Sequence, residues 1–266
     1  MHGLSKIILF IFIWAALLAC QATGTQPVRP VRLEPASQAS PNSAAQPETG
    51  ALAALVWESQ TETGNSNIES CQSLRLTDNG QIWAGHCKTA PEDVEFKTWQ
   101  NQEWTEILDR FATFDYSGPE ERLHFEGRGE VAGPAWQRAI VAWSRFTYNE
   151  QLAGRVSAAS AKTVLSWYMG QAPDRPGYCR HLTVLVYGYA YAEFAPCEGS
   201  GEVQERVGGW LETAEWEQFD GWLYSRGLTE QGNSYFSGQG TEKLTELELA
   251  NLNDWAAVVY DRLTQQ

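Results

Sequence analysis

The side chains of this chain that are best suited to chemistry are its five cysteines and four histidines. Cys20 stands alone near the N-terminus, and the other cysteines form two pairs, Cys71 with Cys87 and Cys179 with Cys197. No histidine lies in an HExxH motif or beside a GxSxG serine, the local patterns typical of metal-dependent and serine-dependent hydrolases. The motifs therefore predict no catalytic residue, although a site assembled from distant residues stays open. We expect a protein that is not an enzyme and uses no cofactor.

The stretch that contains each cysteine pair occurs twice in the chain. Counted from the first cysteine of each pair, leucine follows at +3, glycine at +9 and an aromatic residue at +12. The matched residues are Leu74, Gly80 and Trp83 in one copy and Leu182, Gly188 and Tyr191 in the other. Agreement at so many equal offsets indicates an internal duplication.

The duplication selects one pairing of the four cysteines. Four cysteines allow three pairings, and two equal modules would each join their own pair. The alternative is zinc, because each copy has a histidine within two residues of a cysteine, His86 and His181. These histidines do not occupy matching positions, and neither copy contains a CxxC pair. We therefore predict two disulfides and no metal site.

Each cysteine pair should lie on a β-hairpin. Alternating apolar residues flank Asn79 and Gly80, a dipeptide that favours a type I′ turn with both residues at positive φ. A short strand precedes each hairpin, and a helix that opens with a Glu-Trp pair follows it. A later strand ends in Phe-x-Gly-x-Gly at 125–129 and at 236–240, and a long helix closes each copy.

This order predicts an α+β fold of two homologous modules with pseudo-twofold symmetry, each a small mixed or antiparallel sheet packed by two helices. We place module one at 51–154, a connector at 155–161 and module two at 162–266. The Phe-x-Gly-x-Gly ends do not continue into a phosphate-binding GxGxxG motif. We expect their glycines at a bulge or where the backbone approaches a neighbouring element closely.

Tryptophan is the outlier of the composition, with 12 residues. Most occur at equal positions in the two copies, and residues kept at one place in two divergent halves are most simply core. The pairs are Trp57 with Trp167, Trp99 with Trp210, Trp104 with Trp216 and Trp143 with Trp255, and Trp83 is matched by Tyr191. Trp136 and Trp222 have no such partner, so we expect them to be exposed rings able to bind a ligand such as a glycan.

The N-terminal segment is typical of an exported protein. Lys6 precedes an apolar run, residues 7–19, which is shorter than a membrane span. Residues 17–20, Leu-Leu-Ala-Cys, resemble the lipobox of bacterial lipoproteins. The resemblance implies a signal peptide at 1–19, cleavage before Cys20 and lipidation of that cysteine. A signal peptide cut near Ala22 is the alternative.

The segment after Cys20 should be a tether. Residues 21–50 contain five prolines and no aromatic residue, a composition that cannot bury enough apolar surface to fold. We therefore predict that 20–50 is a lipidated cysteine with a disordered linker, and that acyl chains on Cys20 hold the protein on the outer side of the bacterial cell membrane. The net charge of −14 argues against nucleic acid as a partner.

The element order of each module, strands followed by helix, strand and helix, resembles the emfourin family of inhibitors of thermolysin-like peptidases. The whole chain resembles duplicated lipoproteins of the bacterial envelope, a resemblance that implies no activity. We expect a lipid-anchored extracytoplasmic binding protein with a protein or glycan partner. The alternatives are an inhibitor of an extracellular metallopeptidase and a binder of envelope glycan.

Overall fold

The computed structural model describes residues 53–61, 70–153, 162–197, 203 and 205–265, which all belong to one compact unit, Glu48–Gln266. The expected signal peptide (1–19), the lipidated Cys20 with its tether (20–50) and the connector (155–161) lie outside the described residues. These parts of the sequence analysis therefore stay predictions.

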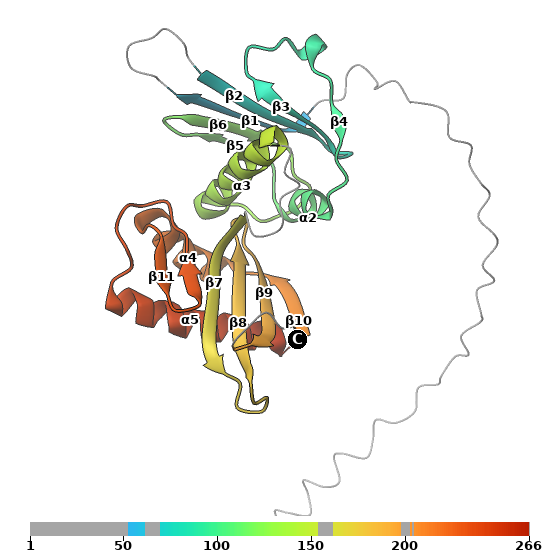
Figure 1. Ribbon diagram of the computed structural model, residues 1–266. Helices are drawn as coiled ribbons and strands as arrows, with labels where there is room; N and C mark the ends of the chain where they lie inside the picture. Colours follow the sequence, from blue (N-terminus) through green and yellow to red (C-terminus); the bar gives the residue numbers. More distant parts are fainter. Residues whose placement is uncertain (1–52, 62–69, 154–161, 198–202, 204, 266) are drawn as a thin grey trace, which may run out of the picture. The chain divides into compact units, whose positions relative to one another are not determined.

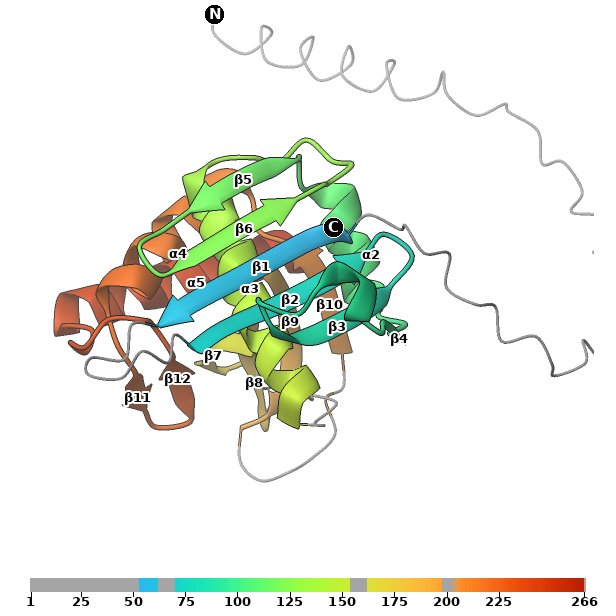
Figure 2. The same cartoon turned by 90° about the horizontal axis from the view of Figure 1, so that it is seen from above.

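The described chain is an α+β protein with two six-stranded antiparallel sheets, four α-helices and one short 3-10 helix (Figures 1 and 2). The strands of the first half are β1 Ala53–Thr61, β2 Ser70–Thr77, β3 Gln81–His86, β4 Lys97–Thr98, β5 Phe114–Ser117 and β6 Glu121–Phe125, and its helices are η1 Pro91–Asp93 (3-10), α2 Gln102–Arg110 and α3 Pro134–Ala153. The second half contains β7 Thr163–Gln171, β8 Tyr178–Leu185, β9 Tyr189–Pro196, β10 Glu205–Trp210, α4 Thr213–Ser225, β11 Thr229–Gln231, β12 Ser234–Phe236 and α5 Glu246–Thr264.

The two sheets have the same topology. The strand order is β4-β3-β2-β1-β6-β5 in the first sheet and β10-β9-β8-β7-β12-β11 in the second. The α+β class is confirmed, and of the two sheet types left open by the sequence the structure has the antiparallel one. Among the described residues, none of the helices combines the length and the apolar character that crossing a bilayer requires.

The hairpin turns differ from the expected type I′ geometry. The N–H of Gly80 donates to the carbonyl oxygen of Thr77 at 3.1 Å, so Asp78 and Asn79 are the central residues of the turn. Gly80 follows them at φ +80°, and Gly188 takes the same place in the second hairpin at φ +84°. The expectation that Asn79 and Gly80 are the two central residues is wrong, because the dipeptide alone does not fix the loop length. A left-handed glycine after the turn is the usual solution for a longer loop.

Both predicted disulfides are present. Cys71 and Cys87 are joined with their Cα atoms 5.3 Å apart, and Cys179 and Cys197 with theirs 4.9 Å apart. Each bond closes the open end of its hairpin across 16 or 18 residues, a loop length for which a disulfide contributes about 3 kcal/mol. None of these four sulfurs is left to hold zinc.

Helix residues bring paired tryptophans into the core. Trp104 of α2 stacks on Trp143 of α3 with 5.7 Å between ring centres, and both rings are buried. In the second half Trp255 of α5 stacks on Phe219 of α4 at 4.9 Å, and Trp216 is fully buried. Trp57 and Trp167 are also buried, whereas Trp99 and Trp210 are half-buried at the margin. The core prediction is confirmed for three of the four pairs.

The Phe-x-Gly-x-Gly ends lie against the ends of helices. The N–H of Arg128 donates to the carbonyl oxygen of Leu108 at 2.7 Å, which satisfies a group left over at the end of α2. A Cβ atom at Gly127 would overlap the carbonyl oxygen of Phe111, and Gly238 repeats this arrangement at the end of α4. The expected close approach to a neighbouring element is confirmed, since only glycine fits there.

Trp136 joins the two halves and is not exposed. Its ring is 1% exposed and stacks on Trp216 with 5.2 Å between ring centres and 21° between planes. Phe111 lies 5.5 Å away on the first-half side, and a Cβ atom at Gly188 would overlap the indole. The expectation of an exposed ring is therefore wrong for Trp136. The buried apolar residues of both halves form one continuous core. Trp136 lies at the junction between the halves, which exists once in the chain, so the second half needs no equivalent residue.

Candidate functional site

The second sheet has one face turned away from α5, the helix that packs against its strands. Along β7, Leu165 and Trp167 point to the core, and the indole N–H of Trp167 donates to Asn253 of α5. Because side chains alternate along a strand, Ser166 and Tyr168 point to the opposite face. In Figure 1, α5 runs behind β7, β8 and β9, so this face is turned to the viewer. We name it the polar face and define it by Ser166, Tyr168, His181, Thr183, Tyr191, Glu193, Arg206 and Tyr235.

Strand register gathers the polar face into two rows. One row crosses β7, β8, β9 and β10 through Tyr168, His181, Glu193 and Arg206. The other crosses β12, β7, β8 and β9 through Tyr235, Ser166, Thr183 and Tyr191. Cβ atoms of direct cross-strand neighbours lie about 4.5 to 5.5 Å apart, and diagonal neighbours reach one another through longer side chains. Residues far apart in the sequence thus meet on one surface.

Three residues form a hydrogen-bonded relay at the centre of the polar face. The Oγ atom of Ser166 lies 2.9 Å from Nε2 of His181, and Nδ1 of His181 lies 3.1 Å from Oε2 of Glu193. The other carboxylate oxygen of Glu193 pairs with Nε of Arg206. An ionised carboxylate can only accept hydrogen bonds, so Nδ1 of His181 must carry the ring proton. In the neutral imidazole, Nε2 is then left to accept the hydroxyl proton of Ser166.

The charge of Glu193 is fixed by its surroundings. Its side chain is buried, and burial acts to raise its pKa. The hydrogen bond from His181 and the charge of Arg206 act in the opposite direction and outweigh burial, so the pKa of Glu193 is lowered. The carboxylate therefore stays ionised at neutral pH and keeps the imidazole in the tautomer described above.

Tyrosine rings frame the relay. The ring of Tyr168 stacks on the imidazole of His181 with 4.3 Å between centres and 19° between planes, which leaves His181 8% exposed. The guanidinium of Arg206 lies 5.1 Å from the ring centre of Tyr191. Burial raises the pKa of Tyr191 and of Tyr235, so both hydroxyls keep their protons and can donate hydrogen bonds. The polar face thus combines half-buried aromatic rings with donors and acceptors held at fixed positions.

The first sheet has a different set of residues on the matching face. By register and disulfide position, Val56, Ser73 and Gly85 correspond to Ser166, His181 and Glu193. The hydroxyl of Ser73 is buried without a hydrogen-bond partner among the described residues, and Trp83 extends over Gly85. A sheet of this topology can therefore form without the relay, and the relay is not a requirement of the fold.

The relay has the arrangement that makes a hydroxyl nucleophilic. A histidine within hydrogen-bond distance of the hydroxyl accepts its proton, and a carboxylate orients the ring. Rapid acyl transfer also needs donors for the oxyanion. Ser166 lies inside the ladders of β7 with β8 and β12, and the N–H of Tyr168 donates to Oγ of Ser234 at 2.9 Å. The relay thus supplies a base and a nucleophile, but the described backbone of β7 has no free pair of N–H groups beside Ser166.

The residues expected to form a site from sequence lie elsewhere. Trp136 is in the core, and Trp222 is half-buried with its edge against Trp255 at 6.2 Å between ring centres. Neither belongs to the polar face, and they have different ring partners. Sequence reasoning missed Ser166 and Glu193; it weighed His181 as a zinc ligand, set that alternative aside, and found no catalytic motif around it. The available signal was the polar residue on each side of the buried Trp167, which marks β7 as a strand with a polar face.

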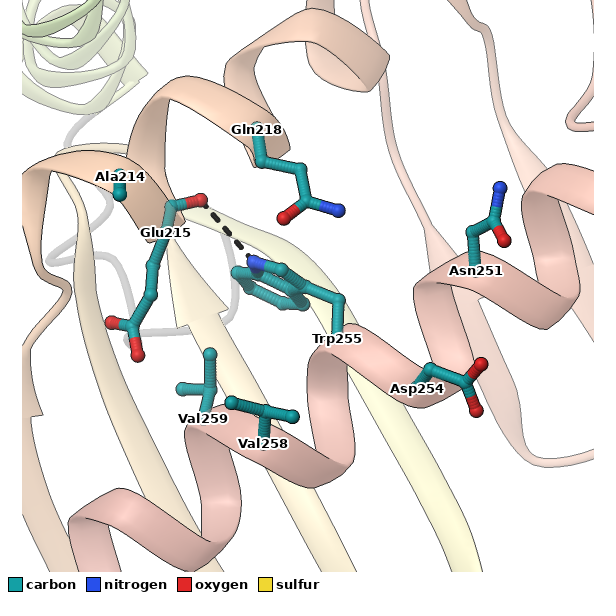
Figure 3. Close-up of a pocket in the computed structure, with 8 residues that line it drawn as sticks. All are labelled: Ala214, Glu215, Gln218, Asn251, Asp254, Trp255, Val258 and Val259. Carbon is teal, nitrogen blue, oxygen red and sulfur yellow. Dashed lines mark hydrogen bonds between the residues drawn. The ribbon is translucent and has the colours of Figure 1, made fainter.

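A shallow groove between α4 and α5 is the weaker candidate (Figure 3). Trp255 projects from α5 toward α4, and its indole N–H donates to the carbonyl oxygen of Glu215 at 3.2 Å. The carboxylate of Glu215 already pairs with Arg262 at 2.7 Å. The groove has about 360 Å³, the lower end of the range for ligand pockets. Its lining residues include no hydroxyl or imidazole, so the polar face is the better candidate.

Among the described residues, no three His, Cys, Asp or Glu side chains are grouped so that they could hold a metal ion. In comparisons with known proteins, no protein-family model matches the chain, and no curated protein is significantly similar to it.

Proposed function

We propose that this protein is a lipid-anchored binding protein on the outer side of a bacterial cell membrane. Acyl chains on Cys20 would attach it, and 20–50 would hold the folded part away from the lipid. Both disulfides support a location in an oxidising compartment. The net charge of −14 disfavours electrostatic binding to anionic headgroups, so the acyl chains must provide the attachment. Labelled palmitate should enter the protein and be lost in Cys20→Ala; incorporation that survives this change would rule the anchor out.

We further propose that modules 51–154 and 162–266 arose by duplication, each with a sheet packed by two helices. The two sheets share one strand order, and each carries a disulfide across the same hairpin. A glycine at positive φ ends each hairpin turn. In each half, another glycine lies against the C-terminal end of the first α-helix, α2 or α4. These features sit at equal places in both halves, and chance does not readily produce so many of them together.

We assign ligand binding to the polar face of the second module, with a polysaccharide as the ligand class. The observation that carries this assignment is that tyrosine rings and paired polar groups occupy one face of the sheet, turned away from α5. Ring faces can stack on sugars, while Arg206 and the tyrosine hydroxyls can bind their hydroxyl groups. The matching face of the first sheet carries no relay, so we expect one binding face per chain.

Retention of the full chain on insoluble envelope polysaccharide tests this assignment. Tyr191→Ala should reduce retention about tenfold, the effect of losing a ring contact worth about 1.4 kcal/mol. Trp83→Ala is the matched control, because Trp83 holds the same register position in the first sheet. Equal losses in the two variants, or no loss in Tyr191→Ala, would remove the polar face as the site.

A peptidase inhibitor is the second candidate, favoured by the loop at 172–177. The loop contains two prolines, and the N–H of Arg175 donates to the carbonyl oxygen of Ala172 at 3.2 Å. The N–H of Cys197 donates to Gly177 at 3.0 Å beside the disulfide. A loop ordered in advance loses little entropy on docking. This candidate predicts inhibition of a thermolysin-like peptidase by the full chain and its loss on reduction; no inhibition by the oxidised chain would exclude it.

A further inference from the structure

We propose that Ser166 is a nucleophile that accepts an acyl group from an ester, with His181 as its general base. This adds a covalent activity to the proposed binding function and replaces the expectation that the protein is not an enzyme. The inference rests on the 2.9 Å distance between Oγ of Ser166 and Nε2 of His181 and on the carboxylate at Nδ1. A hydroxyl, an imidazole and a carboxylate in this order form the constellation that activates serine on unrelated folds.

The orientation of the base is fixed from two sides. Glu193 accepts the Nδ1 proton of His181, and Arg206 holds the far oxygen of that carboxylate. Tyr168 stacks on the imidazole and limits its tilt. Nε2 therefore faces Ser166 as an acceptor without further rearrangement, which is what a general base needs before it takes a proton.

The fold alone does not account for this arrangement. Burying a carboxylate costs free energy unless it is paired, and the matching places in the first sheet hold the uncharged Val56, Ser73 and Gly85. The second sheet instead buries Glu193 and then needs both His181 and Arg206 to satisfy it. The lowered pKa of Glu193, a buried carboxylate with two specific partners, is the kind of perturbation that is found at reactive sites.

The chemical step balances within the site and its substrate. Oγ of Ser166 attacks the ester carbonyl as its proton moves to Nε2 of His181. The tetrahedral adduct collapses, the bond to the alkoxy group breaks, and His181 returns the proton to the departing alcohol. Water then attacks the acyl-serine by the same route and releases a carboxylic acid, so one ester and one water give one acid and one alcohol.

The surroundings of Ser166 also predict that turnover is slow. Its strand is hydrogen-bonded on both sides, so stabilisation of the oxyanion falls to side chains. Hydrogen-bond donors aimed at the oxyanion supply a large part of the rate in fast enzymes, and the backbone of β7 does not provide them. Ser166 is only half-buried and lies on the polar face, so we expect a small reagent to reach it. An irreversible reagent is therefore a sharper probe than substrate turnover.

A fluorophosphonate probe tests the proposal on the full chain with both disulfides intact. Its phosphorus should bond to Oγ of Ser166 with loss of fluoride, and peptide mass spectrometry should place the label there without recourse to any variant. His181→Gln should lower the labelling rate about a hundredfold or more, the usual contribution of a general base. Ser225→Ala, an exposed serine that donates within α4 to Gly221, is the control that should change nothing.

Each outcome separates the covalent step from binding. No label on the folded chain, under conditions that label a known serine hydrolase, overturns the proposal, as does a label at another residue. A label on Ser166 that His181→Gln leaves unchanged also overturns it, because the hydroxyl would then react without its base. Polysaccharide retention measured on the same samples reports on the proposed function alone. Retention without labelling removes only the covalent step, and labelling without retention removes only the glycan assignment.

Discussion

Replacing Gly188 by alanine should destabilise the protein through two separable causes. The first is backbone strain, because Gly188 has φ +84°, a conformation that costs an L-residue about 1 to 2 kcal/mol. Alanine also lowers the conformational entropy of the unfolded chain, which offsets about 0.4 to 1 kcal/mol of this cost. The second cause is overlap, because the new Cβ atom would run into Cζ3 of Trp136 and lie 2.8 Å from its Cη2. Overfilling a packed core typically costs about 1 to 3 kcal/mol.

A matched glycine isolates the second cause. Gly177 has φ +85°, and a Cβ atom there would meet nothing within 4 Å. Gly177→Ala should therefore cost only the net backbone term, about 1 kcal/mol, and Gly188→Ala about 2 to 4 kcal/mol. Thermal unfolding of the full chain, followed by circular dichroism, resolves the difference, because 1 kcal/mol shifts the midpoint by about 2 to 4 °C at this size.

A double-mutant cycle supplies the decisive result. In a Trp136→Ala background the overlap is gone, so adding Gly188→Ala should then cost no more than Gly177→Ala does. Trp136→Ala alone should cost about 3 to 5 kcal/mol as a buried ring is lost. The unfolding free energy could instead fall as little in Gly188→Ala as in Gly177→Ala, or fall equally with and without the indole. Either result would show that Trp136 does not pack against the turn at Gly188.

Two further predictions concern the core and the relay. Trp143→Ala and Trp255→Ala should each cost about 3 to 5 kcal/mol in unfolding free energy because both rings are buried, whereas Trp83→Ala, at a half-buried ring, should cost less; an unchanged melting temperature in the first two contradicts their place in the core. Because the folded pKa of Glu193 is lowered, its ionised form adds stability that is present above the unfolded pKa of about 4.3 and is lost as the pH falls through the folded value. The difference in unfolding free energy between wild type and Glu193→Gln should therefore shrink as the pH is lowered from about 7 to about 3, and a difference that is constant with pH refutes the pairing.

Features set by short stretches of sequence could be predicted. The cysteine spacing located both disulfides, and the repeated glycines marked places where a Cβ atom cannot fit. Gly80 was recognised as a turn residue, yet its place in the turn was wrong, because the loop length depends on how Leu76 pairs with Ile82. Local patterns thus identify special residues more reliably than the geometry around them.

The polar face could not be predicted, because cross-strand register creates it. Ser166, His181, Glu193 and Arg206 lie on four different strands, and a shift of one residue in any strand would turn its side chain to the core side. The prediction of an exposed ring at Trp136 was wrong for a related reason. Its burial depends on the contact between the two halves, and matching one half of the sequence with the other contains no information about that contact.

The same contact gives the first half a part in the chemistry proposed for the second. His181 and Glu193 lie on the hairpin formed by β8 and β9, which Cys179–Cys197 closes at its open end. At the other end the turn at Gly188 rests on Trp136, which comes from α3 of the first half. A hairpin fixed at both ends cannot slip in register, and the relay needs that register to keep its imidazole between hydroxyl and carboxylate. The second half carries the polar groups, and the first half holds the strands that align them.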